Sequence, residues 1–109
     1  MIRTLLPAGV LVAGAAALAT TDGSGDPAFG RRLADDLCSE CHVVSPAQNH
    51  PGRRSAPDLT VRVRDPVITE TALRSYLQTS HTRMPNIMLS QEQMDDIIAY
   101  LLSLKGGTQ

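Results

Sequence analysis

The sequence predicts an all-α domain with about three main helices joined by long loops. Three segments repeat apolar residues at intervals of three or four, which places those side chains on one face of a helix. No segment alternates apolar and polar residues over the length of a strand. The 109 residues suit one domain, and ten Lys and Arg against eleven Asp and Glu argue against a nucleic-acid binder.

The N-terminus has the pattern of a secretory signal peptide. Arg3 gives a positive start, an uncharged run follows to Ala19, and the residues at its end are small, as a cleavage site requires. The run is short for a membrane span, which needs about 20 residues. We therefore expect an exported, periplasmic protein, with an uncleaved membrane anchor as the alternative. The expected divisions are a signal peptide, a flexible linker and a folded domain, which cover residues 1–19, 20–25 and 26–107.

The first helix is expected to begin at Pro27. Asp26 can cap its free amides, and proline suits the first helical position. Gly30 and Ala34 are small enough to let a second helix come close. Beside them, four residues at four-residue spacing predict an apolar stripe: Phe29, Leu33, Leu37 and Cys41.

Residues 43–66 are expected to form a long irregular loop. Four of the seven prolines lie in this stretch. Loops of this length in a compact domain are usually functional or wrapped around a ligand.

Two further helices follow the loop. One is predicted from Glu70 to Gln78, with Thr69 as its cap, and its apolar face consists of Ala72, Leu73, Tyr76 and Leu77. The last begins after Ser90, which forms a capping box with Gln93. Lys105 suits its negative end, and two glycines follow as a stop. Its predicted buried face consists of Met94, Ile97, Ile98, Leu101 and Leu102.

The string Cys38-Ser39-Glu40-Cys41-His42 carries the chemistry. Two cysteines three residues apart can each form a thioether with one vinyl group of haem, and His42 then lies under the iron as an axial ligand. A disulfide would leave His42 unexplained, and a zinc site would need ligands that a second cysteine pair does not supply. A thioredoxin-like redox pair would need strands around it. Haem c attached through Cys38 and Cys41 is therefore the favoured interpretation.

The sixth iron position has several candidate ligands. Met84 is favoured because it precedes Pro85 in a loop between two helices, far enough beyond His42 to reach the other haem face. Met94 is expected in the core of the last helix and His50 in solvent. Met88 is a weaker candidate, and His81 is expected at the surface or beside a haem propionate. A Met84 that only packs near the haem edge is the alternative.

From Asp26 to Lys105 the chain resembles a class I cytochrome c of the small bacterial monohaem type. The resemblance rests on four features: the attachment string with Gly30 eight residues before it; Ala56-Pro57-Asp58-Leu59; Met84-Pro85 with His81 three residues earlier; and the final helix with Tyr100.

The resemblance implies the cytochrome c fold, with loops wrapped around one covalently bound haem. It also implies that the Pro57 carbonyl accepts a hydrogen bond from His42 and so orients the imidazole. Tyr100 is expected to cross the first helix with its ring against Gly30. The chain has no tryptophan to hold a haem propionate, so the contacts of the propionates are left undetermined.

The function that follows is transfer of single electrons between exported or membrane redox partners, such as a donor dehydrogenase or respiratory complex and an acceptor oxidase or reductase. We expect a monomer that is not an enzyme and that meets a membrane only if the N-terminal segment is retained. The alternatives are a peroxidase-like or dehydrogenase-associated haem enzyme and a gas-sensing module, which need an open sixth site.

The middle loop carries a cluster of four arginines, Arg53, Arg54, Arg62 and Arg64. They are expected to form a solvated face, and the alternatives are binding of the haem propionates or docking of an acidic partner.

Overall fold

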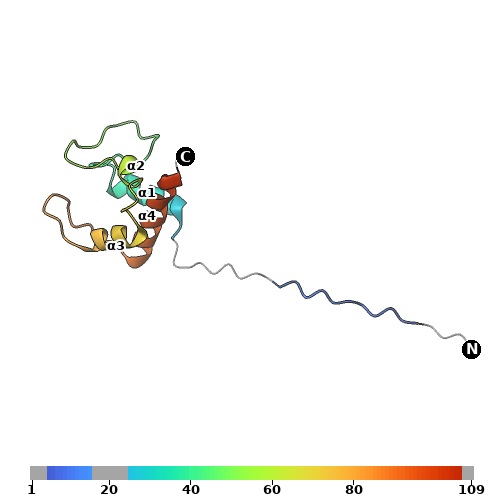
Figure 1. Cartoon of the computed structure of the whole chain (residues 1–109). Coiled ribbons are helices and arrows are strands. Elements are labelled where there is room, and N and C mark those ends of the chain that lie inside the picture. Colours follow the sequence, from blue (N-terminus) through green and yellow to red (C-terminus); the bar gives the residue numbers. More distant parts are fainter. Residues whose placement is uncertain (1–4, 16–24, 107–109) are drawn as a thin grey trace, which may run out of the picture.

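The computed structural model describes residues 5–15 and 25–106 (Figure 1). The helices α1 and α4 pack against each other, α3 lies beside α4, and the long loops extend to one side of them. The described residues include no strand, so the all-α prediction is confirmed. The elements are α1 (Pro27–Leu37), α2 (Leu59–Arg62), α3 (Glu70–Gln78), α4 (Gln91–Ser103) and a 3-10 turn, η1 (Leu104–Gly106).

The three main helices begin at the residues that the capping patterns indicate. The Asp26 carboxylate accepts hydrogen bonds from the first-turn amides of α1, and the Thr69 hydroxyl accepts one from Ala72 at the start of α3. Ser90 and Gln93 complete the capping box of α4: the Gln93 amide donates to the Ser90 hydroxyl over 3.1 Å, and the Ser90 amide donates to the Gln93 side chain over 3.0 Å.

The predicted apolar stripe of α1 is wrong. The helix ends at Leu37, so Cys41 lies beyond it, and the side chains of Phe29 and Leu37 are each 41% exposed. Its buried residues are Gly30 and Ala34. The face with the small residues is buried because it lets the backbone of α4 approach more closely than a row of large side chains would.

The crossing of α1 and α4 is a backbone contact. A Cβ atom on Gly30 would overlap the main-chain carbonyl of Asp96 in α4. The three nearest atoms belong to the backbone of Asp96 and Ile97, so the closest contact at this glycine is with the main chain of α4. The Asp96 carboxylate also accepts a hydrogen bond of 2.7 Å from the Asp26 amide, 70 positions away in the chain. The N-terminus of α1 is therefore held to the middle of α4.

Tyr100 joins α4 to the segment that follows the attachment string. Its side chain is buried, and its hydroxyl donates a hydrogen bond of 2.6 Å to the Val44 carbonyl. Met94 is buried as predicted, whereas Leu102 is only partly buried. The main core cluster consists of Ala34, Val44, Val63, Ile97, Tyr100, Leu101 and Leu104.

The expected loop over residues 43–66 contains a short helix that the proline count concealed. Asp58 caps α2, since its carboxylate accepts hydrogen bonds from the Thr60 amide at 2.9 Å and the Thr60 hydroxyl at 2.6 Å. The rest of this stretch has no helix or strand. Val63, the C-cap of α2, is buried in the core and so holds the loop against the helices.

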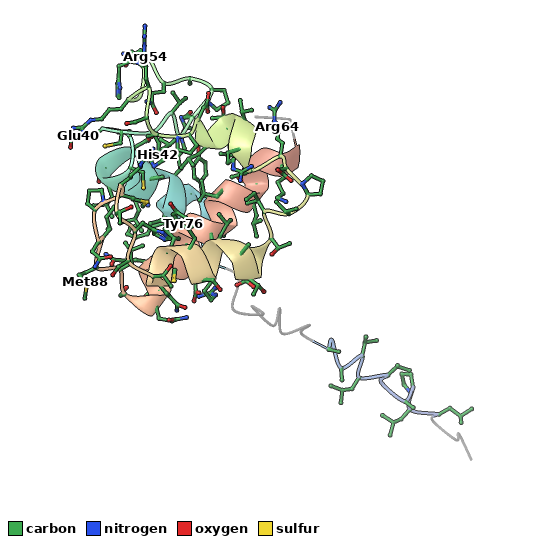
Figure 2. All side chains as sticks on the ribbon, turned by 60° about the vertical axis from the view of Figure 1, so that its left-hand side comes forward. Glu40, His42, Arg54, Arg64, Tyr76 and Met88 are labelled. Carbon is green, nitrogen blue, oxygen red and sulfur yellow. The ribbon has the colours of Figure 1, made fainter. Side chains whose placement is uncertain are left out.

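Helix α3 contributes no fully buried residue. It is joined to α4 by Arg74, whose guanidinium lies 2.7 Å from the Asp95 carboxylate of α4 and 2.7 Å from Glu70 of its own helix. Hydrogen bonds to Glu70 and Asp95 raise the pKa of Arg74. In Figure 2, Arg54, Glu40 and Met88 lie at the edge of the molecule.

The N-terminal segment is described only over residues 5–15, which form no helix or strand and expose their apolar side chains. Within the described residues, no helix is both long and apolar enough to cross a membrane. The remaining parts of the predicted signal peptide, most of the predicted linker and Gly107 at the predicted stop lie outside the described residues. The signal peptide and the linker therefore stay predictions.

Candidate functional site

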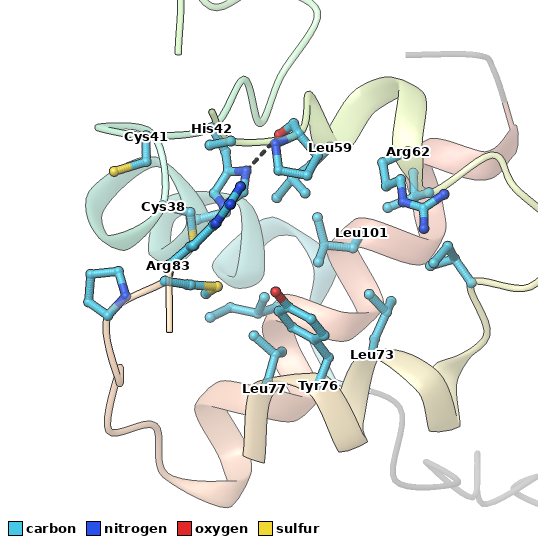
Figure 3. A pocket seen from close by; sticks show the side chains of 18 of the residues that line it. Cys38, Cys41, His42, Leu59, Arg62, Leu73, Tyr76, Leu77, Arg83 and Leu101 are labelled. Carbon is cyan, nitrogen blue, oxygen red and sulfur yellow. Dashed lines mark hydrogen bonds between the residues drawn. The ribbon is translucent and has the colours of Figure 1, made fainter. Parts of the chain in front are cut away.

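A cavity of about 480 Å³ opens between the end of α1, the loop before α2, and helices α3 and α4. This volume falls within the range of small-molecule and cofactor sites. Apolar side chains from different elements form its walls, among them Leu59, Leu73, Leu77, Ile97 and Leu101. The cavity explains why α3 has no fully buried residue: its Leu73 and Leu77 side chains pack partly against the core and partly face this space (Figure 3).

The attachment string forms a tight turn at one side of the cavity. Cys38 is the C-cap of α1, and its carbonyl accepts hydrogen bonds from the Cys41 amide at 3.1 Å and the His42 amide at 2.9 Å. This turn brings Cys38, Cys41 and His42 to the cavity lining together. The turn is possible because α1 ends at Leu37. In a continued helix, Cys41 would lie almost one helical turn beyond Cys38 along the axis.

Both cysteines are free thiols, which removes the disulfide alternative for this structure. Burial, and to a lesser extent the neighbouring Cys41, raise the pKa of the Cys38 thiol to about 11. At neutral pH the thiol is therefore uncharged and behaves as a small apolar group in an apolar wall. Within the described residues, no group of three or more His, Cys, Asp or Glu side chains could hold a metal ion, which also removes the zinc alternative.

His42 is oriented by a single strong contact. Its Nδ1 lies 2.6 Å from the Pro57 carbonyl oxygen, the hydrogen bond that the resemblance implies (Figure 3). A carbonyl can only accept, so Nδ1 carries the proton. In this tautomer the lone pair of Nε2 can bind a metal, and the bond to Pro57 fixes the orientation of the ring.

The backbone around His42 is held by residues that the sequence analysis did not identify. The Gln48 side chain accepts from the Val44 amide at 2.9 Å and donates to the His42 carbonyl at 3.1 Å. Gly52 packs directly on the string, because a Cβ there would lie 2.5 Å from the Cys41 carbonyl oxygen. The neighbouring Arg53 amide donates to that same carbonyl over 2.7 Å. In the sequence, the Pro51-Gly52 pair was the feature that could have indicated this close backbone contact.

The candidates for the sixth iron ligand are separated by the structure. Met84 and Pro85 line the cavity, whereas Met88 is 91% exposed and Met94 is buried in α4. His50 is exposed. His81 is absent from the lining and instead stacks on the ring of Tyr76. Of the five candidates, Met84 alone is placed in the cavity wall.

The arginines divide into two groups. Arg53 and Arg62 line the cavity, whereas Arg54 and Arg64 do not. Arg83, which the sequence analysis did not single out, also lines it. Cys38 and Cys41 lie on one side of the view in Figure 3, and Arg62 lies on the other. All four arginines of the middle loop are exposed, as a solvated face requires, and two of them also border the cavity.

The cavity has what a covalently bound haem requires. It offers two thiols, one imidazole with a free nitrogen, one thioether and apolar walls of sufficient extent. The family model for cytochrome c matches residues 27–105. The chain belongs to the cytochrome c family. Haem c, covalently bound, is accordingly the cofactor of this cytochrome, and the protein is a haem-based electron carrier.

Cytochrome c-552 of Bradyrhizobium diazoefficiens is similar to this cytochrome. The two are 30% identical over 95 residues, which cover 87% of this chain and 90% of the relative. No solved structure matches the chain significantly. The family model and this relative both confirm the resemblance inferred from the attachment string and the accompanying motifs.

Proposed function

We propose that this cytochrome shuttles single electrons between exported redox proteins, with haem attached to Cys38 and Cys41 and with His42 and Met84 as the axial ligands. The observation that carries the proposal is the placement of all four side chains around one apolar cavity. The N-terminal sequence pattern supports export to the periplasm. Donor dehydrogenases or respiratory complexes and acceptor oxidases or reductases are the proposed classes of partner.

Each residue has a separate role in this proposal. When bound, haem supplies an iron centre that gains or loses one electron. The Pro57 carbonyl holds His42 in the tautomer that presents Nε2, so the ligand needs no rearrangement between oxidation states. Met84 would bind the iron of this haem through its thioether sulfur, which would exclude added ligands and raise the reduction potential. The apolar walls keep water away from the site.

Replacing Met84 with alanine tests this proposal. We expect the ferric protein to lose the long-wavelength absorption band of methionine-ligated haem and the ferrous protein to bind carbon monoxide readily. We also expect the reduction potential to fall by a sizeable part of the roughly 0.8 V range over which axial ligands set haem potentials. Met88→Ala is the matched control, because that methionine is exposed outside the cavity. An unchanged band and potential in Met84→Ala would show that another group binds the iron.

The wild-type protein distinguishes an electron carrier from the two alternatives. A peroxidase-like enzyme or a gas sensor requires an open or labile sixth position, so its ferrous form would bind carbon monoxide at neutral pH. Wild-type protein that resists carbon monoxide while Met84→Ala binds it would support the carrier. Ready binding by the wild type would favour the alternatives.

Arg62 is the residue that we propose for the propionate edge of haem. The vinyl and propionate groups occupy opposite edges of the ring, and Arg62 lines the cavity across from the two cysteines (Figure 3). Its guanidinium is paired with Asp65 at 3.1 Å, which holds it beside the cavity. A guanidinium is well suited to pair with a carboxylate.

Replacing Arg62 with glutamine is expected to lower the reduction potential, because a nearby positive charge favours the reduced iron. It is also expected to raise the pKa of the propionic acid group, since the charged form loses its partner. The step in a plot of potential against pH should therefore move to higher pH. Arg64→Gln is the control, because Arg64 is exposed and lies outside the cavity lining. Equal effects of the two substitutions would argue against a specific propionate contact.

A further inference from the structure

We propose that His81 is a positioning residue that ties the segment carrying Met84 to the end of α3 and thereby keeps Met84 in the cavity wall. The inference rests on the proposed role of Met84 as an axial ligand. His81 lies three residues before Met84 and does not line the cavity itself. Its effect on the iron would therefore be indirect.

The segment between α3 and α4 needs such a tie. Residues 80–89 contain no helix or strand, and none of them forms a backbone–backbone hydrogen bond with another described residue. Six of these ten residues are exposed. Met84 is thus carried by a segment whose position depends on side-chain contacts.

His81 makes contacts through both the edge and the face of its ring. Its Nε2 lies 2.8 Å from the Tyr76 carbonyl oxygen and 3.1 Å from the Thr79 hydroxyl. Its ring stacks on the Tyr76 ring, with centroids 3.6 Å apart and planes inclined by 13°. A hydrogen bond and a stacked ring on the same residue determine both the position and the orientation of His81.

The partner of His81 is well placed for this role. Tyr76 lies in the last turn of α3, where helix carbonyls lack their usual intrahelical amide donors. The N–H of His81 donates to the Tyr76 carbonyl, which also accepts from the Thr79 amide at 3.3 Å and the Thr79 hydroxyl at 3.2 Å, so all these contacts meet at the end of α3. The Tyr76 ring also lines the cavity (Figure 3). The contact therefore joins the Met84 segment to a residue of the haem-facing wall.

A second contact closes the segment around Met84. The Asn86 side-chain amide donates a hydrogen bond of 2.9 Å to the Ser80 hydroxyl. Residues 80–86 therefore form a small loop that is closed at its base, with Met84 inside it. His81 joins this base to α3. Loss of the His81 contacts would leave the loop closed on itself but free to move away from the cavity.

The test compares histidine variants of the haem-containing protein. His81→Phe keeps an aromatic ring for stacking but removes the N–H donor, and His81→Leu removes both contacts. His81→Gln supplies an N–H donor and is expected to restore part of the effect. His50→Phe is the matched control, because His50 is exposed and, within the described residues, its ring is paired with the Gln48 side chain over 3.5 Å, away from Met84. Covalent haem content and helix content, measured by mass and circular dichroism, identify variants that fold.

The readouts are the affinity of the ferric protein for added imidazole and the strength of its long-wavelength methionine band. We expect His81→Leu to bind imidazole about tenfold more tightly than wild type, since one hydrogen bond and one aromatic contact are lost. The imidazole affinity of His81→Phe should lie between those of wild type and His81→Leu, and that of His50→Phe should equal the wild-type value. The methionine band should weaken in the same order.

The outcomes of Met84→Ala and the His81 variants separate the two proposals. If Met84→Ala binds imidazole strongly and folded His81→Leu binds it as wild type does, the inference about His81 is overturned and the axial role of Met84 stands. If Met84→Ala behaves as wild type, the axial role itself fails. Complete loss of the sixth ligand in His81→Leu, with an intact spectrum in Met84→Ala, would identify His81 as the ligand and overturn both.

Discussion

Replacing both Cys38 and Cys41 with serine is expected to abolish covalent haem attachment. Serine is nearly isosteric with cysteine but cannot form a thioether, so the exported chain should have the mass of the polypeptide alone. Each single substitution should leave one thioether and still retain a haem through denaturation. The measurement is the intact mass of the denatured protein, produced together with export and haem-attachment machinery.

Two neighbours in the same turn provide the control. Ser39 and Glu40 lie between the cysteines but do not line the cavity, so replacing both with alanine should preserve the added mass of one haem. A haem-sized mass gain in the double serine variant would mean that another residue forms the bond. The N-terminal mass of each product also reports whether the chain starts near Thr20, as cleavage of the predicted signal peptide requires.

Loss of haem should also disturb the fold unevenly. The packing of α1 on α4 and the Gly30 crossing depend on protein atoms alone. The Leu73 and Leu77 side chains of α3 pack partly against the core and partly face the cavity, so without haem they lose the contacts on their cavity side. Far-ultraviolet circular dichroism of the double serine variant should therefore show lower helix content than the wild type. An unchanged helix content would show that α3 is held by its own contacts to α4.

Replacing Gly30 with alanine is expected to have the largest effect on stability of any single methyl addition. The new Cβ would overlap the Asp96 carbonyl, and backbone atoms cannot turn aside as a side chain can. The helix propensity of alanine returns only about 1 kcal/mol. Added methylenes in packed cores typically cost about 1–3 kcal/mol, and here a whole helix must shift. We expect a net loss at the upper end of this balance, about 2 kcal/mol in the free energy of unfolding.

Denaturant unfolding of the haem-containing protein measures this loss. Asp36→Ala on the exposed side of the same helix is the control and should change stability by about 0.5 kcal/mol or less. The Gly30→Ala variant should unfold at a clearly lower denaturant concentration. A midpoint equal to that of wild type, with haem retained, would mean that α1 and α4 do not cross at the distance described.

Local chemistry determined the helices that the sequence predicted correctly. Asp26, Thr69 and Ser90 each cap amides within three residues, so the start of each main helix depends on neighbours in the chain and not on the rest of the fold. The same holds for the attachment string, whose chemistry lies in five consecutive residues. The prolines also indicated a loop, although Asp58 caps a short helix within it.

Only the tertiary structure decided which surfaces meet. Periodicity assigned Phe29 and Leu37 to the buried side of α1, but the approach of α4 buried Gly30 and Ala34 instead. An apolar repeat identifies large hydrophobic side chains as the buried ones, whereas a close helix crossing requires small residues at the contact.

The site shows the same division between local and long-range determinants. The type of cofactor and Met84 as the candidate sixth ligand could both be predicted from the sequence, because each depends only on residue types and their order. The stacking of His81 on Tyr76, the contact of Gly52 with Cys41 and the Tyr100 bond to Val44 depended on the folded chain. Each of these contacts depends on the conformation of a loop that brings the two residues together. The residue types in those loops are compatible with many conformations. Packing against the helices and around the cavity favours one of these conformations.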